Sequence, residues 1–174
     1  MEALLVVDVQ VDMVEPEPAY RVRETIDTLV RLRAAAAANG VPIVFVRNNG
    51  EPGEPDIPGS PGWELHPDLS PGPADPIIDK RQQNAFAGTG LADLLTGLGV
   101  DTVVVGGLQS EFCIRATTLG AIEAGFEAVL IEDGHTTFGA GGRAQEILER
   151  VNAELEGVAR LENADAIVAR WGSR

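Results

Sequence analysis

Short runs of apolar, β-branched residues alternate with longer amphipathic patterns along almost the whole chain, and this alternation restricts the fold more than any other feature. The short runs are typical of strands buried on both faces, and the longer patterns have the period of helices. We predict strands at 3–9, 42–47, 75–79, 101–107 and 127–133, and a weaker sixth strand at 159–163. We predict helices at 20–39, 89–98, 112–125 and 142–156.

Such an alternation is typical of a parallel sheet that is covered by helices on both faces. Right-handed crossovers leave few possible topologies, and the commonest strand order of this type is 3-2-1-4-5-6. We therefore predict an α/β fold, a three-layer α/β/α arrangement with a central six-stranded, mainly parallel sheet in this order. The 174 residues have the length of a single domain, 1–174, that buries a substantial core.

Residues 48–75 interrupt the pattern. Seven of the 11 prolines fall in this Pro/Gly-rich loop, so it can form neither a helix nor a central strand. Long loops of compact domains are usually functional or disordered. Because Trp63 lies in its middle, we expect the loop to pack over a site and not to form a solvated insertion.

The charge and the composition exclude several classes of function. The net charge of −14 would repel nucleic acid and anionic membranes. No apolar run is long enough to span a membrane, and the N-terminal stretch lacks the pattern of a secretory signal, so we expect a cytoplasmic protein. The single cysteine, Cys113, cannot form an intramolecular disulfide, and with two scattered histidines it gives no zinc-site spacing.

Three side chains of different chemistry lie where predicted strands end. Asp8 closes the first strand, Lys80 follows the third, and Cys113 comes just after the fourth, where the chain turns into a helix. The carboxyl ends of parallel strands meet at the edge of the sheet where ligands bind. Separately, each residue has an ordinary interpretation: a capping aspartate, a surface lysine and a buried cysteine. Together they are a base, a cation and a nucleophile.

Lys80 is also unusual in the composition. It is the only lysine among the 13 basic residues. A lysine supplies a compact point charge, which suits a tight site better than the broad guanidinium of arginine does.

Three stretches resemble the isochorismatase-like cysteine hydrolases. These are "LLVVDVQVDM" (4–13), "DKRQQNAFAGTGLADLL" (79–95) and "VVVGGLQSEFCIRATTLGAIEAGF" (103–126). They contain the family's signatures in order and, with the segments between them, cover nearly the whole chain. The resemblance implies that Asp8, Lys80 and Cys113 are the catalytic triad and that the peptide bond between Leu108 and Gln109 is cis. It also implies a homo-oligomer, a dimer or a tetramer.

The three side chains fit the chemistry of acyl transfer. A cysteine attacks as the thiolate, and we expect the N-terminus of the following helix to lower the pKa of Cys113. Asp8 would take the thiol proton, and Lys80 would keep Asp8 ionised. The backbone amides of Gln109 and Cys113 would bind the oxyanion. We predict hydrolysis of an amide or related C–N bond of a small molecule through a Cys113 thioester.

Two departures from the family's patterns narrow the expected reaction. Members that hydrolyse nicotinamide carry an Asp-x-His metal motif after the second strand, where this chain has "VFVRNNGEP". We interpret His66 as a surface residue and predict neither a metal nor a cofactor. Members that cleave isochorismate characteristically lack the cysteine. Cys113 therefore favours the amidohydrolase branch, whose substrates are amides, carbamoyl compounds and lactams, including those of streptothricin type.

Residues from several segments are predicted to form the substrate pocket. They are Gln10, Met13, Trp63, Phe86, Glu111 and Phe112. Each has an alternative interpretation, since the aromatic residues could belong to the core and Glu111 could favour a helix N-terminus. His135 could reach the rim, but we interpret it as a solvated turn residue.

Other functions stay open or are disfavoured. An isochorismate-type vinyl-ether hydrolase and a catalytically silent binding relative remain alternatives. A dinucleotide-binding domain is disfavoured because "VGGLQSE" is not a G-x-G-x-x-G loop. A phosphoryl-transfer enzyme with a D-x-D motif is disfavoured because Val9 and Gln10 follow Asp8.

Overall fold

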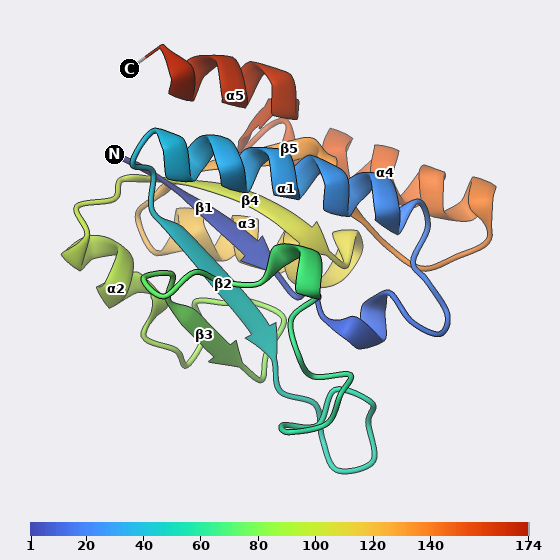
Figure 1. Cartoon of the computed structure of the whole chain (residues 1–174). Coiled ribbons are helices and arrows are strands. Elements are labelled where there is room, and N and C mark those ends of the chain that lie inside the picture. The colour runs from blue at the N-terminus through green and yellow to red at the C-terminus, as the bar shows by residue number, and fades with distance from the viewer. Residues whose placement is uncertain (174) are drawn as a thin grey trace.

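A six-stranded sheet forms the centre of the computed structural model, which describes residues 1–173 (Figure 1). The strands are β1 (Glu2–Val7), β2 (Ile43–Asn48), β3 (Ile77–Lys80), β4 (Thr102–Leu108), β5 (Glu127–Thr136) and β6 (Arg160–Glu162). They lie in the order β3-β2-β1-β4-β5-β6, and every neighbouring pair is parallel. The predicted fold class and strand order are confirmed.

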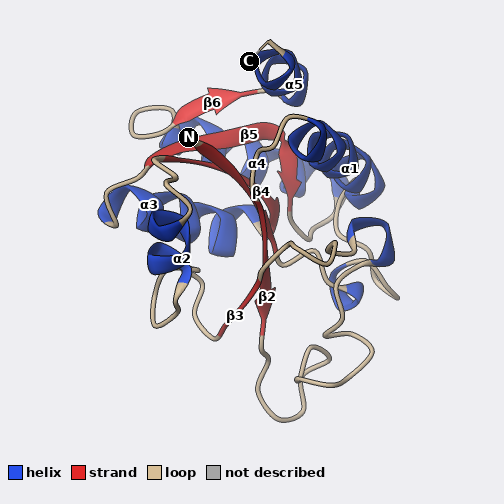
Figure 2. Ribbon diagram, turned by 60° about the vertical axis from the view of Figure 1, so that its left-hand side comes forward, coloured by secondary structure: helices blue, strands red, loops and turns tan. Residues whose placement is uncertain are grey.

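Helices cover both faces of the sheet (Figure 2). They are α1 (Val22–Ala38), α2 (Leu91–Gly97), α3 (Arg115–Glu123), α4 (Gly141–Leu155) and α5 (Ala164–Gly172). In β1, Leu4 and Val6 pack toward α1 and α5, whereas Leu5 and Val7 pack toward α2, α3 and α4. Side chains that alternate along a strand point to opposite faces, so each face has its own apolar core.

One helix, α5, was not predicted. It begins after Asn163, whose side-chain oxygen accepts a hydrogen bond from the Ala166 amide at 2.9 Å. An asparagine in this position is a common start of a helix. Its apolar face includes Ile167 and Trp171, both fully buried against α1 and the sheet.

The loop between β2 and β3 folds back over the end of β1. Gln10 and Leu65 form an isolated antiparallel bridge, and the Val11 amide donates to the Glu64 carbonyl at 2.9 Å. Two short 3₁₀ helices, η1 (Val11–Met13) and η2 (Pro67–Leu69), flank this contact. In Figure 1 the loop leaves β2 beyond the end of the sheet and returns across it. It is therefore packed near the predicted site.

The strands β1 and β4 come very close together where the predicted site lies. Gly107 pairs with Val7 and has a φ of +130°. A Cβ atom at Gly107 would stand 1.9 Å from the Val7 carbonyl oxygen. Only glycine tolerates both this conformation and this approach, so it brings the ends of β1 and β4 side by side.

Candidate active site

Asp8 follows the last residue of β1 and turns its carboxyl group into the protein. Its φ of 51° lies in the left-handed region, which aspartate tolerates better than most residues do. The Asp8 amide donates to the Val46 carbonyl at 2.9 Å, which keeps the backbone aligned with β2. Only 1% of Asp8 is exposed. The carboxyl group is therefore held in a fixed, nearly dry position.

Lys80 ends β3 and reaches across β2 to Asp8. Its Nζ atom lies 2.7 Å from Asp8 Oδ2 and 3.2 Å from Asn48 Oδ1. The Lys80 side chain has no exposed surface. A buried ammonium needs such partners, because burial of an unpaired charge is very costly.

Cys113 completes the cluster from the other side of β1. It lies in a π-helical turn, η3 (Ser110–Ile114), that connects β4 to α3. Its Sγ atom is 3.3 Å from Lys80 Nζ. The peptide bond between Leu108 and Gln109, just before this turn, is cis. The structure thus brings Asp8, Lys80 and Cys113 together.

The charges of the three groups are strongly coupled. Burial raises the pKa of Asp8, although Lys80 acts to lower it. Burial alone would lower the pKa of Lys80, but the negative charge of Asp8 and the interaction with Cys113 outweigh it and raise the pKa. Lys80 is therefore a permanent cation, and Asp8 is a stronger base than an exposed carboxylate.

The expectation for Cys113 was wrong in direction. Burial raises the pKa of the Cys113 thiol to about 12, and the charge of Asp8 acts the same way, while Lys80 opposes both. Loss of the thiol proton to solvent would leave a buried net negative charge. Transfer of the same proton to Asp8 keeps the charge of the cluster unchanged. The arrangement therefore favours an internal proton transfer over a resting thiolate.

Two polar residues of the site were missed by the sequence analysis. Asn48, the last residue of β2, connects β3 to the loop. Its Oδ1 accepts from Lys80 of β3, and its Nδ2 donates to Asp56 Oδ2 at 2.6 Å. Asp56 belongs to the loop and is 5% exposed. The only available signal was that Asn48 directly follows a buried strand. Asp56 of the loop therefore orients the Asn48 side chain, which in turn accepts a hydrogen bond from Lys80.

Asp12 is the other acidic group close to the cluster. Burial, followed by the charges of Asp56 and Asp8, raises the pKa of Asp12 to about 6. Asp12, Met13, Gln109 and Phe138 line a cavity of about 360 Å³. The Met13 Sδ atom is 3.9 Å from Gln109 Nε2. Met13 therefore lies beside the predicted oxyanion-binding segment, and its contact with substrate stays a prediction.

Two predicted pocket residues, Gln10 and Phe86, pack against other parts of the protein. Gln10 is fully buried, and its Nε2 donates to the carbonyls of Asn48 and Trp63 at 3.1 and 3.0 Å. Its Oε1 accepts from the Asn48 amide at 2.8 Å. These bonds use both amide hydrogens, so Gln10 anchors the loop and does not face a substrate. Phe86 packs on Phe126 with ring centroids 5.7 Å apart and lies partly buried against the core between the sheet and α2 to α4, so its contact with substrate stays a prediction.

The other three predicted pocket residues differ in their surroundings. Trp63 stacks on Arg47, whose Cζ atom is 3.4 Å from the ring centroid. Its Nε1 donates to Asn49 Oδ1 at 2.7 Å, so Trp63 holds the loop against β2. Glu111 has a buried Oε2 atom without a hydrogen-bond partner in the described structure. Phe112 is 44% exposed. Glu111 and Phe112 directly precede Cys113 in sequence and stay predictions as substrate contacts.

Both histidines were interpreted wrongly. His66 is 7% exposed, and its Nδ1 accepts from the Asp68 amide at 3.3 Å, which caps η2. His135 is 2% exposed and lies at the end of β5. Both residues lie next to turn-forming residues in the sequence, and this pattern does not reveal that later segments cover them.

Two further properties concern the described part of the chain, residues 1–173. No three of its His, Cys, Asp and Glu side chains are grouped so that they could hold a metal ion. None of its helices is both long and apolar enough to cross a membrane.

Comparison with known proteins identifies the family. The model of the isochorismatase domain matches residues 2–162. The chain belongs to the isochorismatase family of hydrolases. A family protein from Chromobacterium violaceum ATCC 12472 has a crystal structure that superimposes with a TM-score of 0.90 at 30% identity. The superposition covers 99% of this chain and 94% of that one.

Two curated relatives of this isochorismatase-family chain are a hydrolase and an amidase by name. A streptothricin hydrolase from Streptomyces noursei is 43% identical over 143 residues, which cover 79% of this chain and 55% of that protein. An N-carbamoylsarcosine amidase from Arthrobacter sp is 28% identical over 123 residues, which cover 60% and 47%. The chain thus spans about half the length of these curated relatives.

Proposed function

We propose that this isochorismatase-family protein hydrolyses an amide or related C–N bond of a small molecule, with Cys113 as the nucleophile. The observation that carries the proposal is the position of Lys80 Nζ, 2.7 Å from Asp8 Oδ2 and 3.3 Å from Cys113 Sγ. A base, a cation and a thiol in direct contact form an activated nucleophile.

The first half of the reaction forms a thioester. Asp8 takes the thiol proton while the sulfur of Cys113 attacks the carbonyl carbon and the C–S bond forms. The carbonyl oxygen becomes an oxyanion, which the backbone amides of Gln109 and Cys113 stabilise. Asp8 then gives the proton to the leaving nitrogen, the C–N bond breaks and the amine or ammonia departs.

The second half consumes one water molecule. Asp8 takes a proton from the water as its oxygen attacks the thioester carbon. The C–S bond breaks, the acid is released, and the sulfur recovers a proton from Asp8. Lys80 stays protonated throughout and stabilises whichever of the two partners is negative. Every proton moves between Asp8 and the reacting groups, so we propose a reaction that needs no metal.

We propose amides, carbamoyl compounds and lactams as the substrate class. The names of the curated relatives, a streptothricin hydrolase and an N-carbamoylsarcosine amidase, support including streptothricin and carbamoyl compounds in this range. Residues that line the cavity beside Gln109 include Asp12 and Met13, and these would contact the part of the substrate next to the reacting carbonyl.

A product screen in EDTA tests the proposal. The purified protein is incubated with primary amides, carbamoyl compounds, streptothricin and simpler lactams. Ammonia release is measured for the first two classes. Because lactam opening releases no ammonia, lactam products are measured by mass spectrometry as the gain of one water. We expect turnover of at least one class in EDTA, and failure of all of them contradicts the proposal.

A further inference from the structure

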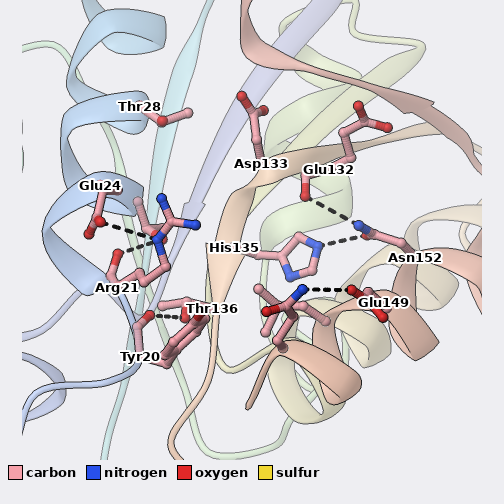
Figure 3. Close-up of a pocket in the computed structure, with 13 residues that line it drawn as sticks. Tyr20, Arg21, Glu24, Thr28, Glu132, Asp133, His135, Thr136, Glu149 and Asn152 are labelled. Atoms are coloured by element: carbon pink, nitrogen blue, oxygen red, sulfur yellow. Dashed lines mark hydrogen bonds and ion pairs between the residues drawn. The ribbon is translucent and has the colours of Figure 1, made fainter. Parts of the chain in front are cut away.

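His135 connects the turn that carries Cys113 to α4. Its Nδ1 atom is 2.7 Å from Ser110 Oγ. Its Nε2 atom is 2.8 Å from Asn152 Oδ1, and a dashed line in Figure 3 marks this second contact. The pairing of β5 with β4 places His135 opposite Gly107 and Thr136 opposite Leu108. Ser110 has no exposed surface, and His135 is 2% exposed. The hydrogen bond between Ser110 and His135 is therefore buried, and Asn152 continues the connection to the partly exposed face of α4.

The donor and the acceptor of each hydrogen bond around His135 follow from the contacts of Asn152. Asn152 Nδ2 donates to the Glu132 carbonyl at 3.2 Å, as the dashed line in Figure 3 marks. Asn152 therefore presents its Oδ1 atom to His135. If the amide were reversed, Oδ1 would face the Glu132 carbonyl oxygen, and two acceptors would meet. It follows that Nε2 of His135 carries the proton and that Nδ1 accepts a hydrogen bond from the Ser110 hydroxyl.

The surroundings of His135 agree with a neutral ring. Burial lowers the pKa of His135, and this effect outweighs the hydrogen bond to Asn152 and the charge of Asp133. A cavity of about 450 Å³ lies beside the ring, between α1, the end of β5 and α4. The titratable and charged groups that line it with His135 are Tyr20, Arg21, Glu24, Glu132, Asp133 and Glu149.

We propose that His135 is a positioning residue for the nucleophile: its Nδ1 fixes the Ser110 hydroxyl and thereby the turn that aims Cys113 at Lys80 and Asp8. Ser110 is the first residue of η3, and Cys113 lies in the same turn. Ser110 also follows Gln109, whose amide is part of the proposed oxyanion site. A small displacement of this turn would move the thiol and an oxyanion donor together. Only the kinetic consequence rests on the proposed function.

Nuclear magnetic resonance of the unmodified protein tests the hydrogen-bond pattern directly. The chain contains two histidines, so a His66→Gln variant assigns the ring signals. We expect the His135 ring to be neutral, with its proton on Nε2, between about pH 7 and 8. A charged ring, or a proton on Nδ1, in this range overturns the proposal. This result does not depend on whether the protein hydrolyses any amide.

Four variants test the consequence for Cys113. Ser110→Ala and His135→Leu each remove the bond, whereas His135→Asn keeps an acceptor near the position of Nδ1. Thr102→Val is the matched control, because it removes a buried hydroxyl at the opposite edge of the sheet. With one cysteine in the chain, iodoacetamide alkylation reports on Cys113 alone, and its pH dependence follows the titration of the thiol in contact with Asp8 and Lys80.

The expected results separate positioning from packing. In Ser110→Ala and in His135→Leu, the released turn should expose the thiol to water, and the thiol pKa should fall because burial is the main cause that raises it. The kcat for a hydrolysed amide should fall about 10- to 100-fold with little change in KM, and the double variant should be no worse than either single one. His135→Asn and Thr102→Val should resemble the unmodified protein. An unchanged thiol titration in both bond-removing variants overturns the proposal. An equal loss of kcat in His135→Asn and His135→Leu also overturns the proposal, because it would assign the effect to packing.

Discussion

At the scale of single residues, the Lys80 ammonium has one acceptor for each of its N–H donors. It has three N–H donors, and three acceptors surround it: Asp8 Oδ2, Asn48 Oδ1 and Cys113 Sγ. The side chain is fully buried. A guanidinium would bring a wider, planar set of donors into a space that fits one nitrogen atom. This explains physically why the chain has a lysine here, while every other basic residue is an arginine.

Lys80→Arg should therefore inactivate the protein nearly as completely as Lys80→Ala. We expect kcat/KM for a hydrolysed amide to fall about 100-fold or more in both variants. The neighbouring substitution Arg81→Lys is the matched control, because Arg81 is largely exposed, and it should leave kcat/KM unchanged. Full activity of a folded Lys80→Arg protein would show that the site does not require a compact ammonium.

Asp12 should make the protein less stable as the pH rises. The folded state raises the pKa of Asp12 from 3.8 to about 6, so it binds this proton more tightly than the unfolded chain does. Ionisation between about pH 4 and pH 6 then costs folding free energy. Asp12→Asn should remove this cost and raise the free energy of unfolding by about 1 kcal/mol at pH 7, a value reduced for partial exposure.

Urea unfolding at pH 4 and at pH 7 measures this effect. The gain should be present at pH 7 and absent at pH 4. Asp93→Asn, at an exposed site on α2, should change neither value. A gain of equal size at both pH values would mean that the charge of Asp12 is not its cause.

The convergence of the three residues of the proposed triad could be predicted, because each one lies at the end of a recognisable strand or just after it. Parallel strands bring their carboxyl ends to one edge, so Asp8, Lys80 and Cys113 converge whatever the details of packing. Asn48 and His135 could not be predicted, because their partners, Asp56 and Ser110, meet them only through the tertiary structure. The direction of the Cys113 pKa shift failed for the same reason. A helix N-terminus can be recognised in the sequence, but burial beside a carboxylate cannot.

At the scale of structural elements, the loop between β2 and β3 is part of the site. Gln10 ties its beginning to its middle through three hydrogen bonds with the backbones of Asn48 and Trp63. Asp56 of the same loop holds Asn48 against Lys80. The stability of the loop and the geometry of Lys80 are therefore linked.

Gln10→Leu should release the loop. It removes three hydrogen bonds and leaves backbone groups without partners, which should cost about 2–3 kcal/mol of unfolding free energy. Limited proteolysis should cut within 49–63 faster than in the unmodified protein. Gln82→Leu, at an exposed glutamine, should change neither property. Unchanged stability and cleavage in Gln10→Leu would contradict the anchoring role.

The elements themselves were predicted unevenly. Long helices and central strands were found because their apolar periodicity is strong, as in α1 and β1. The helix expected at 112–125 begins instead with the π-helical turn η3, because the backbone must change direction between β4 and α3. Such a turn has no sequence signature. The signal for α5 was available in Asn163, the N-cap, but its short apolar pattern was not recognised.

At the scale of the whole molecule, α5 joins the two ends of the described chain. Trp171 is fully buried, and its Nε1 donates to Glu2 Oε2 at 2.5 Å. Arg170 forms ion pairs with Glu2 and Glu162. The last helix thereby connects β1 to β6, although β4 and β5 lie between these two strands in the sheet. The amino end of β1, where the contacts of Glu2 lie, is far from Cys113, because Glu2 begins β1 and Asp8 follows its last residue.

Trp171→Ala should separate stability from activity. Loss of a large buried side chain should lower the free energy of unfolding by about 3–5 kcal/mol. The kcat of the protein that remains folded should not change, because the site lies at the opposite edge of the sheet. Val158→Ala, at an exposed site, is the control for stability. A large loss of kcat in folded Trp171→Ala protein would show that α5 also supports the site.

The proposed reaction depends most directly on Cys113 as the nucleophile. The decisive measurement is the rate at which Cys113→Ala hydrolyses the best amide or lactam found in the product screen, compared with the unmodified protein under the same conditions. If Cys113 forms the thioester, the rate should fall by about 1,000-fold or more, while the variant keeps its fold and still binds the substrate. A Cys113→Ala protein that hydrolyses this substrate at the unmodified rate would contradict the account.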